Sequence, residues 1–359
     1  MESIKPKLDK IFSKVDVDLI LIKNTEVKDP NFLYVTGFTS GIFEGDVLIL
    51  KRDSAYLLTS QLEYETALSQ KRDGLKVLNV RSSRKKYLSL LSKFIKGKSI
   101  GINGSFITYA SFVAYEGFKP RAMVDVSKAF EEARLLKDDE EVQSIRKAIS
   151  ITKLAIMQAQ KYLREGITEL TFAAQIEYIM KSLGATGLAF DTIVAFGKNA
   201  ALPHHMPDET KLKSGDFVLI DTGAKYKNYC ADISRTIIFD EKKARNAKRM
   251  EEMLKVVKDA QLMAIKAIKP GISGAKVSKM VTSYINSYAN GRYKGKFIHA
   301  LGHSVGIEVH DATIFSKKPS VKIKDRMVLA IEPGIYINGF GGVRIEDDIL
   351  VTKDGAVVL

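Results

Sequence analysis

Two apolar hairpin patterns in the C-terminal half of this 359-residue chain carry carboxylates where a strand should be buried, which limits the folds open to it. In the first pattern, FVLID is an apolar strand that ends on Asp221, TGAKYKN is the turn, and YCADISRT returns with Asp232. Strand alternation places Asp221 on the same face as Phe217 and Leu219, normally a buried face. A carboxylate there is unfavourable unless it is paired or binds a metal. The alternative is a pair of turn aspartates in water.

The second pattern has the same form. MVLAIEPGIYI contains an apolar strand that ends on Glu332 after VLAI, NGFGG is the turn, and VRIEDDILV returns with three acids, Glu346, Asp347 and Asp348. Alternation places Glu346 and Asp348 on one face and Asp347 on the other, and it does not choose between Glu346 and Asp348. The NGFGG segment is not a phosphate-binding loop, since it lacks the G-x-G-x-x-G spacing and no helix follows it.

All five histidines lie between residues 204 and 310. His303 and His310 flank the turn in GHSVGIEVH, near enough in sequence to reach one cleft. His299 has the features of a structural histidine. His204 and His205 follow a proline in a loop, where the alternative is a solvent-exposed pair.

One candidate metal site combines four carboxylates and one imidazole: Asp221, Asp232, His303, Glu332 and Glu346. Carboxylates packed together repel each other unless protons or metals neutralise them. Oxygen-dominated ligation with one imidazole suits manganese, cobalt or iron, as well as zinc. The chain has no H-E-x-x-H and no cysteine cluster, which argues against a thermolysin-like zinc helix and a structural zinc site.

A faint internal repeat bears on how these residues would converge. YLREGITELTFAAQIEYIMKSLG, from Tyr162, resembles AIKPGISGAKVSKMVTSYINSYAN, from Ala267, because both follow the order helix, Gly-Ile-Ser/Thr, helix. The glycine is typical of a helix C-cap and the Ser or Thr of the next N-cap. One acid-bearing hairpin follows each copy, so two such halves would bring the hairpins together near a pseudo-twofold axis. The alternative is a chance recurrence of helix-Gly-helix junctions.

The N-terminal part has a different pattern, in which short strands alternate with helices, as in an α/β domain. We expect strands in DLILIKN, DVLILK, AYLLTS, LKVLNV and SIGING, and helices in KPKLDKIFSK, LEYETALSQK, YLSLLSKFI and ITYASFVAYEGF. From about residue 126 the chain becomes charged and helical. The length favours two domains, which we place at 1–125 and 141–359 with a linker at 126–140. Further helices are expected at about 169–183, 242–269 and 273–289.

Composition indicates an ordinary globular protein, with 45% hydrophobic and 27% charged residues. The apolar runs are too short to span a bilayer and the N-terminus has no apolar signal-peptide core, so we expect no membrane partner. The single cysteine, Cys230, excludes an intrachain disulfide and fits a reducing compartment, so we expect a cytoplasmic protein. The net charge of +14 predicts a lysine-rich solvated surface rather than a nucleic-acid partner, because the densest basic cluster, RSSRKK, is short.

In this order and context, the motifs resemble those of the prolidase and Xaa-Pro aminopeptidase family. DPNFLYVTGFTSG resembles part of that family's creatinase-like N-terminal domain, and GHSVGIEVHD, AIEPGIY and VRIEDDILVT resemble its catalytic domain. The resemblance covers nearly the whole chain. It implies an α/β N-terminal domain and an α+β pita-bread C-terminal domain with a pseudo-twofold symmetric antiparallel sheet. It also implies a homodimer that acts on a small peptide.

The resemblance further implies the ligand roles. Asp221 would bind one metal ion, while Asp232 and Glu346 would bridge both. His303 and Glu332 would complete the second ion. Two cations about 3.5–4 Å apart lower the pKa of one shared water and give a bridging hydroxide that attacks the Xaa-Pro imide bond. Manganese and cobalt are the expected metals, with zinc and iron as alternatives.

Three residues are implied as catalytic. Glu332 would pass a proton to the leaving nitrogen, and His204 and His310 would polarise the carbonyl or stabilise the oxyanion. A proline nitrogen carries no N–H in the peptide bond, so a metal pair and an imino-specific pocket replace the usual grip on that hydrogen.

The chain departs from the prolidase pattern after VHD. Prolidases carry an arginine there that is thought to bind the carboxylate of the dipeptide, but Ile314 stands near that position, and Lys317 or Lys318 would have to replace it. We expect a prolidase acting on dipeptides, with an Xaa-Pro aminopeptidase acting on longer peptides as the alternative. The second alternative is a non-catalytic binding protein on the same scaffold. Methionine aminopeptidases and creatinase resemble the chain less well, because the former lack the N-terminal domain and the latter works without metal.

Overall fold

The computed structural model describes residues 3–81, 83–316, 318 and 320–359. The chain divides into two compact units, Met1–Arg134 and Leu135–Leu359. The stretch where we expected a linker, 126–140, contains α6 (Ser127–Leu135) and the first residues of α7 (Asp139–Ala159). Among the helices of the described residues, none is both long and apolar enough to cross a membrane.

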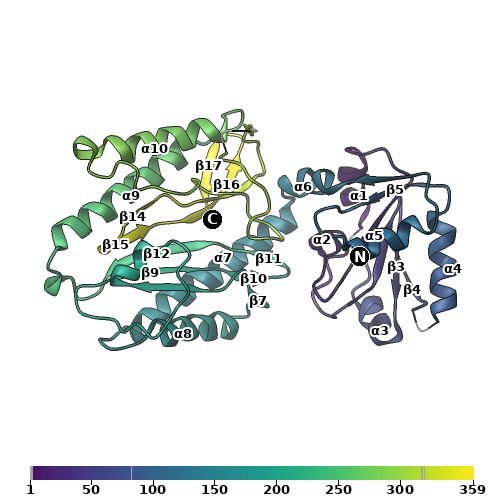
Figure 1. Ribbon diagram of the computed structural model, residues 1–359, viewed down its shortest axis with the longest axis horizontal. Helices are drawn as coiled ribbons and strands as arrows, with labels where there is room; N and C mark the ends of the chain where they lie inside the picture. The colour runs from purple at the N-terminus through teal and green to yellow at the C-terminus, as the bar shows by residue number, and fades with distance from the viewer. Residues whose placement is uncertain (1–2, 82, 317, 319) are drawn as a thin grey trace. The chain divides into compact units, whose positions relative to one another are not determined.

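The N-terminal unit is built on one mixed sheet with the strand order β4-β3-β2-β1-β5-β6 (Figure 1). Its strands are β1 (Leu19–Lys23), β2 (Val47–Leu50), β3 (Ala55–Thr59), β4 (Leu75–Asn79), β5 (Ser99–Ile102) and β6 (Ala122–Asp125). β2 is antiparallel to both neighbours, and the other pairs are parallel. The five predicted strands are confirmed. We did not predict β6, a largely exposed strand without an apolar run.

Helices connect these strands, as the alternating pattern predicted. They are α1 (Lys5–Phe12), α2 (Pro30–Thr36), α3 (Gln61–Ser69), α4 (Arg84–Ile95) and α5 (Tyr109–Glu116). We did not predict α2. Its N-cap is Asp29, whose side chain accepts a hydrogen bond from Asn31 N at 2.8 Å, and a proline takes the first helical position. This Asp-Pro start is a recognised helix signal that the sequence contained.

Two helix pairs flank the strands of the C-terminal unit (Figure 1). They are α7 with α8 (Glu169–Ser182), and α9 (Ala247–Ala267) with α10 (Gly274–Gly291). Three short 3-10 helices are η1 (Gln160–Tyr162), η2 (Gly197–Ala201) and η3 (Glu241–Lys243). α7 begins at a capping box, in which Asp138 and Glu141 each accept a hydrogen bond from the other's backbone N–H.

The strands of this unit form small antiparallel sheets, ordered β12-β9-β8, β11-β10-β7, β13-β16-β17 and β14-β15. Those of the first half are β7 (Gly187–Leu188), β8 (Ile193–Phe196), β9 (Phe217–Thr222), β10 (Ala224–Tyr226), β11 (Tyr229–Cys230) and β12 (Ile233–Ile238). Those of the second half are β13 (Val328–Ile331), β14 (Gly334–Ile337), β15 (Gly341–Arg344), β16 (Asp347–Thr352) and β17 (Gly355–Val358).

Each predicted hairpin is interrupted at its acids. In the first, β9 pairs with β12 and β10 pairs with β11, so that Asp232 lies in the gap between β11 and β12. In the second, β13 pairs with β16 and β14 pairs with β15. Glu332 lies in the gap between β13 and β14, and Glu346 lies in the gap between β15 and β16. The strand predicted to end on Glu332 ends directly before it, at Ile331. The prediction of continuous return strands is wrong at Asp232 and Glu346, because residue alternation alone does not reveal where a ladder breaks.

The first turn is also tighter than we predicted. Of the segment TGAKYKN, only Lys227 and Asn228 form the turn, and both have positive φ. Gly223 lies instead where the backbone passes Ala231: a Cβ on this glycine would lie 1.8 Å from Ala231 O. Gly223 thus lies where the chain passes from β9, which pairs with β12, to β10, which pairs with β11.

The internal repeat extends to its hydrogen bonds. Gly166 N donates to Leu212 O at 2.9 Å, and Gly271 N donates to Ile323 O at 2.8 Å. Leu212 and Ile323 each donate back to the residue after the glycine, at 2.9 Å in both halves. The repeat predicted from the Gly-Ile-Ser/Thr motif is confirmed.

The two hairpins lie side by side, as the repeat predicted (Figure 1). Glu346 N donates to Ser234 O at 3.1 Å. Arg344 N donates to Thr236 Oγ1 at 3.1 Å, and that hydroxyl donates to Arg344 O at 3.0 Å. These bonds join the return strand of one hairpin to the return strand of the other, and so bring their acids together.

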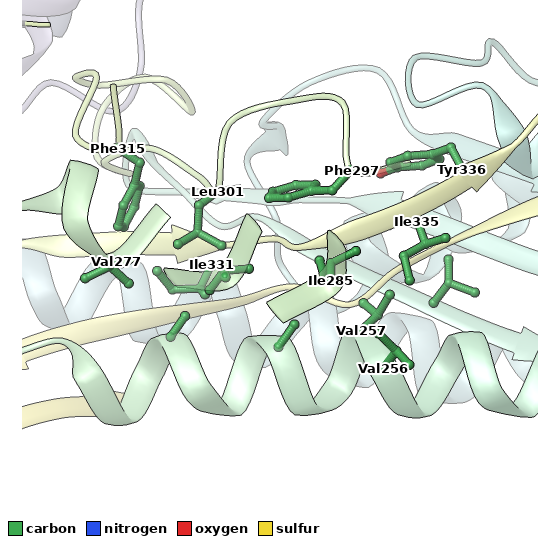
Figure 2. Close-up of a cluster of buried hydrophobic side chains, with 14 of the residues drawn as sticks. Val256, Val257, Val277, Ile285, Phe297, Leu301, Phe315, Ile331, Ile335 and Tyr336 are labelled. Atoms are coloured by element: carbon green, nitrogen blue, oxygen red, sulfur yellow. The ribbon is translucent and has the colours of Figure 1, made fainter. Parts of the chain in front are cut away.

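A large apolar cluster holds the strands against α9 and α10. Figure 2 shows Val257 of α9 next to Ile335 of β14, and both side chains are fully buried. Phe217 and Leu219 of β9 belong to the same cluster. Asp221 follows them at a spacing of two residues, so it lies on the same face of β9. The acid therefore stands on a buried face of its strand, as predicted.

Candidate metal centre

His303 reaches the acids because its segment pairs with the end of β13. Glu332 N donates to Leu301 O at 2.9 Å, and Ala330 N donates to His303 O at 3.0 Å. Gly302 permits this approach: its φ is +150°, and a Cβ there would lie 1.9 Å from Ala330 O. The imidazole is thereby placed beside Glu332.

Three of the predicted ligands converge on one point. Asp232, His303 and Glu346 each offer a ligand atom, and these atoms all lie within 4.8 Å of one another. His303 Nε2 is 3.4 Å from Asp232 Oδ2 and 3.7 Å from Glu332 Oε1. Asp221 is linked to the group through Arg344, whose guanidinium pairs with Asp221 and donates to Ser234 Oγ, the hydrogen-bond donor to Glu346. The five predicted residues therefore form one cluster.

The cluster contains oxygens that lack donors. One carboxylate oxygen on each of Asp221, Asp232 and Glu346 is buried and has no hydrogen-bond partner among the residues that the structure describes. Such an oxygen is unfavourable unless something positive contacts it. A divalent cation prefers an oxygen-rich donor set of this kind, so the residues fit a metal centre.

Burial and the repulsion between neighbouring carboxylates shift the pKa values of the residues in this cluster. Burial first, and then the neighbouring carboxylates, raise the pKa of Asp232 and Glu346 well above the usual range. Burial raises the pKa of Glu332 to about 8, although the Arg344 guanidinium opposes this shift. Burial lowers the pKa of His303 to about 4. A neutral imidazole is the form that binds a metal, and bound cations would relieve the repulsion among the acids.

Arg344 is a residue of this site that the sequence analysis missed. Its side chain is buried, and its guanidinium forms an ion pair with Asp221. It also donates to Ser234 Oγ and to Tyr336 OH, both at 2.9 Å. Ser234 Oγ in turn donates to Glu346 Oε2 at 2.7 Å. Arg344 therefore fixes the position of two acids. An arginine next to acidic residues gave no signal of this role.

The structure separates Glu346 from Asp348, which alternation left open. Glu346 lies in the cluster, whereas Asp348 Oδ2 accepts a hydrogen bond from Asp232 N at 2.9 Å and supports that residue. Burial raises the pKa of Asp348 to about 8. Asp347 points away and pairs with Arg235 at 2.7 Å.

The three residues that we predicted to be catalytic are all at least partly exposed to solvent. His204 and His310 are exposed, and Glu332 is half-buried. The His310 ring lies 4.3 Å from the His303 ring in an edge-on arrangement. His299, interpreted as structural, has Nδ1 at 3.6 Å from Glu332 Oε2. Burial lowers the pKa of His299 to about 4, and the nearby His204 adds to this effect.

Among the described residues, the segment after VHD has no cation at the position where the resemblance to prolidases predicted an arginine, near Ile314. Ile314 is buried in the apolar cluster. Lys318 is exposed, and Lys317 lies outside the described residues.

Two family matches cover almost the whole chain. Residues 6–136 match the creatinase/prolidase N-terminal domain, and residues 143–353 match metallopeptidase family M24. The chain belongs to metallopeptidase family M24. Enzymes of this family use a dinuclear metal centre, and the cluster described above contains candidate ligands for one.

Named relatives extend the comparison. The Xaa-Pro dipeptidase of Pyrococcus horikoshii is 35% identical over 99% of this chain and 97% of its own length. The structure of prolidase from Pyrococcus furiosus matches with a TM-score of 0.85 and 33% identity, over 97% of this chain and 98% of that one. The X-Pro aminopeptidase from Thermotoga maritima matches with a TM-score of 0.87 and 30% identity, over 98% and 97%. The predicted fold, an α/β domain followed by an α+β domain, is confirmed.

Proposed function

We propose that this protein is a dinuclear metallopeptidase that hydrolyses the Xaa-Pro imide bond of dipeptides, which makes it a prolidase. The observation that carries the proposal is the convergence of Asp232, His303 and Glu346, with buried carboxylate oxygens that no described donor satisfies. The similarity to an Xaa-Pro dipeptidase over nearly the full length supports the same substrate class.

The ligand assignment is the one that the resemblance to the family implies. Asp221 would hold one ion, and Asp232 and Glu346 would be shared by both. His303 and Glu332, whose ligand atoms lie 3.7 Å apart, would hold the second ion. When bound, two cations such as manganese or cobalt lower the pKa of a shared water and polarise the scissile carbonyl. Zinc and iron are the alternatives.

The remaining steps belong to side chains of this chain. Glu332 accepts the proton of the attacking water and delivers it to the proline nitrogen, a role open to its half-buried carboxylate next to His303. His204 and His310 are exposed and donate hydrogen bonds to the oxyanion of the tetrahedral intermediate. His299 lies near Glu332, but its two ring nitrogens are each 2.8 Å from another partner, Ala300 O and Tyr336 OH, so we assign it a structural role.

One observation favours the second candidate, an Xaa-Pro aminopeptidase that acts on longer peptides. A dipeptide substrate has a free carboxylate next to the reacting bond, and Ile314 stands buried where prolidases carry the arginine for that carboxylate. A longer peptide needs no such cation. The similarity to the X-Pro aminopeptidase structure agrees with this alternative.

A substrate panel separates the candidates. Xaa-Pro dipeptides, Xaa-Pro tripeptides and Met-leading peptides are incubated with the protein, with and without added Mn²⁺. We expect the dipeptides to be hydrolysed with the highest kcat/KM, and only when metal is present. Faster hydrolysis of the tripeptides would assign the protein as an aminopeptidase. Hydrolysis of the Met-leading peptides alone would contradict both assignments.

The binding-protein alternative predicts a different outcome. In a non-catalytic relative the ligand set need not be complete, whereas here all five ligands are present. If the protein is a peptidase, Asp232→Asn should abolish hydrolysis and leave any binding to nucleic acid unchanged. A wild-type protein that binds nucleic acid tightly but hydrolyses no peptide would favour the binding-protein alternative. The homodimer and the cytoplasmic location stay predictions, and light scattering in solution tests the first.

A further inference from the structure

A second cluster of polar side chains lies around Glu169, the first residue of α8. Glu169 is 0% exposed. Its Oε1 accepts hydrogen bonds from Phe196 N at 2.7 Å and from Asn199 Nδ2 at 3.0 Å. Its Oε2 accepts from His205 Nε2 at 2.7 Å and from Asp208 N at 3.1 Å. All four donors come from one segment, the Phe196–Asp208 loop, so one buried carboxylate holds one loop.

This cluster resembles a metal site in composition, because Glu169, His205 and Asp208 each have a ligand atom within 4.8 Å of the others. Its atoms are already used, however. Each oxygen of Glu169 faces two N–H donors, and Asp208 Oδ1 accepts from Thr210 N at 2.7 Å. A cation would have to displace these donors. The arrangement is therefore a hydrogen-bonded anchor for the loop.

The internal repeat shows that the helix itself does not need this acid. Thr168 and Ser273 are the N-cap residues of α8 and α10, and each forms an antiparallel bridge with a lysine. The next residue is Glu169 in the first half and Gly274 in the second, yet both helices form. At this position of the repeat, a buried acid therefore occurs only in the first half, which is also the half whose loop carries His204.

Hydrogen bonds hold the backbone of this loop both before and after His204. Before it, Pro203 O accepts a hydrogen bond from Arg344 Nη1, at 3.3 Å, and Arg344 belongs to the metal centre. After it, His205 donates its backbone N–H to Leu202 O at 3.1 Å and contacts Glu169 through its ring. The exposed imidazole of His204 therefore projects from a backbone that is held on both sides.

We propose that Glu169 and His205 are a positioning pair that holds His204 in place over the metal centre, an inference that rests on the proposed function. Neither residue touches the substrate. Glu169 acts through the ring of His205 and through the amides of Phe196 and Asp208. If the pair is broken, His204 loses its fixed position and the oxyanion loses a donor. Because that contact exists only in the transition state, kcat falls and KM does not change.

The first test is Glu169→Gln, which keeps the size of the side chain. Its NH₂ group must face one of the two pairs of N–H donors, so two of the four hydrogen bonds are lost. We expect kcat to fall by about 10- to 100-fold, with KM and the affinity for Mn²⁺ in calorimetry unchanged. The control is Glu165→Gln, an exposed acid near the same helix end that accepts from Ser214 Oγ, and it should behave as wild type.

A matched pair at His205 tests the other partner. His205→Gln keeps an N–H donor near the position of Nε2, and most of the activity should remain. His205→Leu removes that donor, and kcat should fall as far as in Glu169→Gln. A Gln variant as impaired as the Leu variant would show that the ring is needed for packing, and would contradict the hydrogen-bonded pair.

A double variant tests whether the pair acts through His204. In a His204→Ala background, Glu169→Gln should cause no further loss of kcat, because the residue being positioned is gone. Losses that multiply would indicate a general structural role and refute the proposal. Amide hydrogen exchange of the metal-loaded protein provides a second readout, in which the Phe196–Asp208 loop should exchange faster in Glu169→Gln while α10 is unchanged.

The outcomes distinguish this inference from the proposed function. If the wild-type protein hydrolyses no Xaa-Pro peptide, the proposed function fails and the positioning role fails with it. If the wild type is active but Glu169→Gln keeps full kcat, or its loop exchanges at the wild-type rate, the positioning pair alone is refuted.

Discussion

The metal-free protein should become less stable as the pH rises from 6.5 to 8. Burial raises the pKa of both Glu332 and Asp348 to about 8. In the unfolded chain these carboxyls release their protons near pH 4. Across this window the folded state therefore binds more protons than the unfolded state, and the free energy of unfolding falls as the pH rises through the folded-state pKa.

The magnitude follows from the two shifts. Below its folded-state pKa, each carboxyl changes the free energy of unfolding by about 1.4 kcal/mol per pH unit. Because this slope flattens near pH 8, the loss over the window is about 1.5 kcal/mol for each, or about 3 kcal/mol for both. Asp232 and Glu346, whose pKa values are also raised, change the stability in the same direction. A total near 3 kcal/mol is a large part of the roughly 5–15 kcal/mol that stabilises a domain.

Two buried histidines oppose this trend only weakly. His299 and His303 have pKa values lowered to about 4 by burial. In the unfolded chain a histidine is half-protonated near pH 6.5, so these two residues raise the free energy of unfolding as the pH increases through that value. From pH 6.5 to 8 this rise is below about 1 kcal/mol for both together, less than the loss from the acids, so the acids determine the trend.

The assay is urea unfolding followed by circular dichroism, since the chain has no tryptophan. It is run with a chelator at pH 6.5 and pH 8. Glu332→Gln should make the loss of stability shallower, because one of the titrating groups is removed. Saturating Mn²⁺ should reverse the trend, because the ligands must be deprotonated to bind metal. A metal-free protein whose free energy of unfolding is constant or rises over this range would refute the clustering of the acids.

The other predictions concern activity and two buried ion pairs. Glu332→Gln should lower kcat on Xaa-Pro peptides by about 10²-fold or more with an unchanged circular dichroism spectrum, and wild-type turnover would remove its assigned role. A chelator should abolish hydrolysis and added manganese or cobalt should restore it, so activity that survives complete metal removal would contradict the metal mechanism. Arg344→Leu should lower the free energy of unfolding of the metal-free protein by about 3–5 kcal/mol, because it leaves Asp221 buried without its partner, and urea unfolding measures the loss. Lys137→Met should cost a similar amount, about 3–5 kcal/mol, since its ammonium contacts Asp311 at 2.9 Å and both side chains are 1% exposed; Asp311→Asn in the same chain should recover part of this loss.

The acids of the hairpins were predictable because of what precedes them. An apolar run such as VLAI must be buried, and a glutamate directly after it, Glu332, is therefore expected to be at least partly buried. The cost of a buried carboxylate then points to a partner or a metal. The repeat added the expectation that two hairpins meet, and the hydrogen bond from Glu346 N to Ser234 O shows that they do.

The breaks in the strands were not predictable from alternation. A period of two residues continues through Asp232 and Glu346 in the sequence, although the ladder stops at both. The signal lay elsewhere, in Gly223, which we interpreted as part of a turn and which instead permits a close backbone approach. Such a contact depends on a segment that the local sequence does not show.

Arg344 and Glu169 mark a second limit of prediction. Arg344 contacts Asp221, more than a hundred residues earlier in the chain, and Glu169 contacts a loop that begins at Phe196. Neither has a partner at a spacing that a helix or a strand defines. Their roles arise when the fold brings distant segments together, and a single sequence contains no pattern for that.

Calorimetric titration of the metal-free protein with Mn²⁺ tests the central claim most directly. We predict two equivalents bound per wild-type chain, and fewer than two equivalents in both Asp232→Asn and Glu346→Gln. Asp347→Asn, a neighbouring acid that pairs with Arg235 on the other face, should still bind two equivalents. Two equivalents retained in both bridging variants, or none bound by the wild type, would contradict the assignment of this cluster as a dinuclear centre.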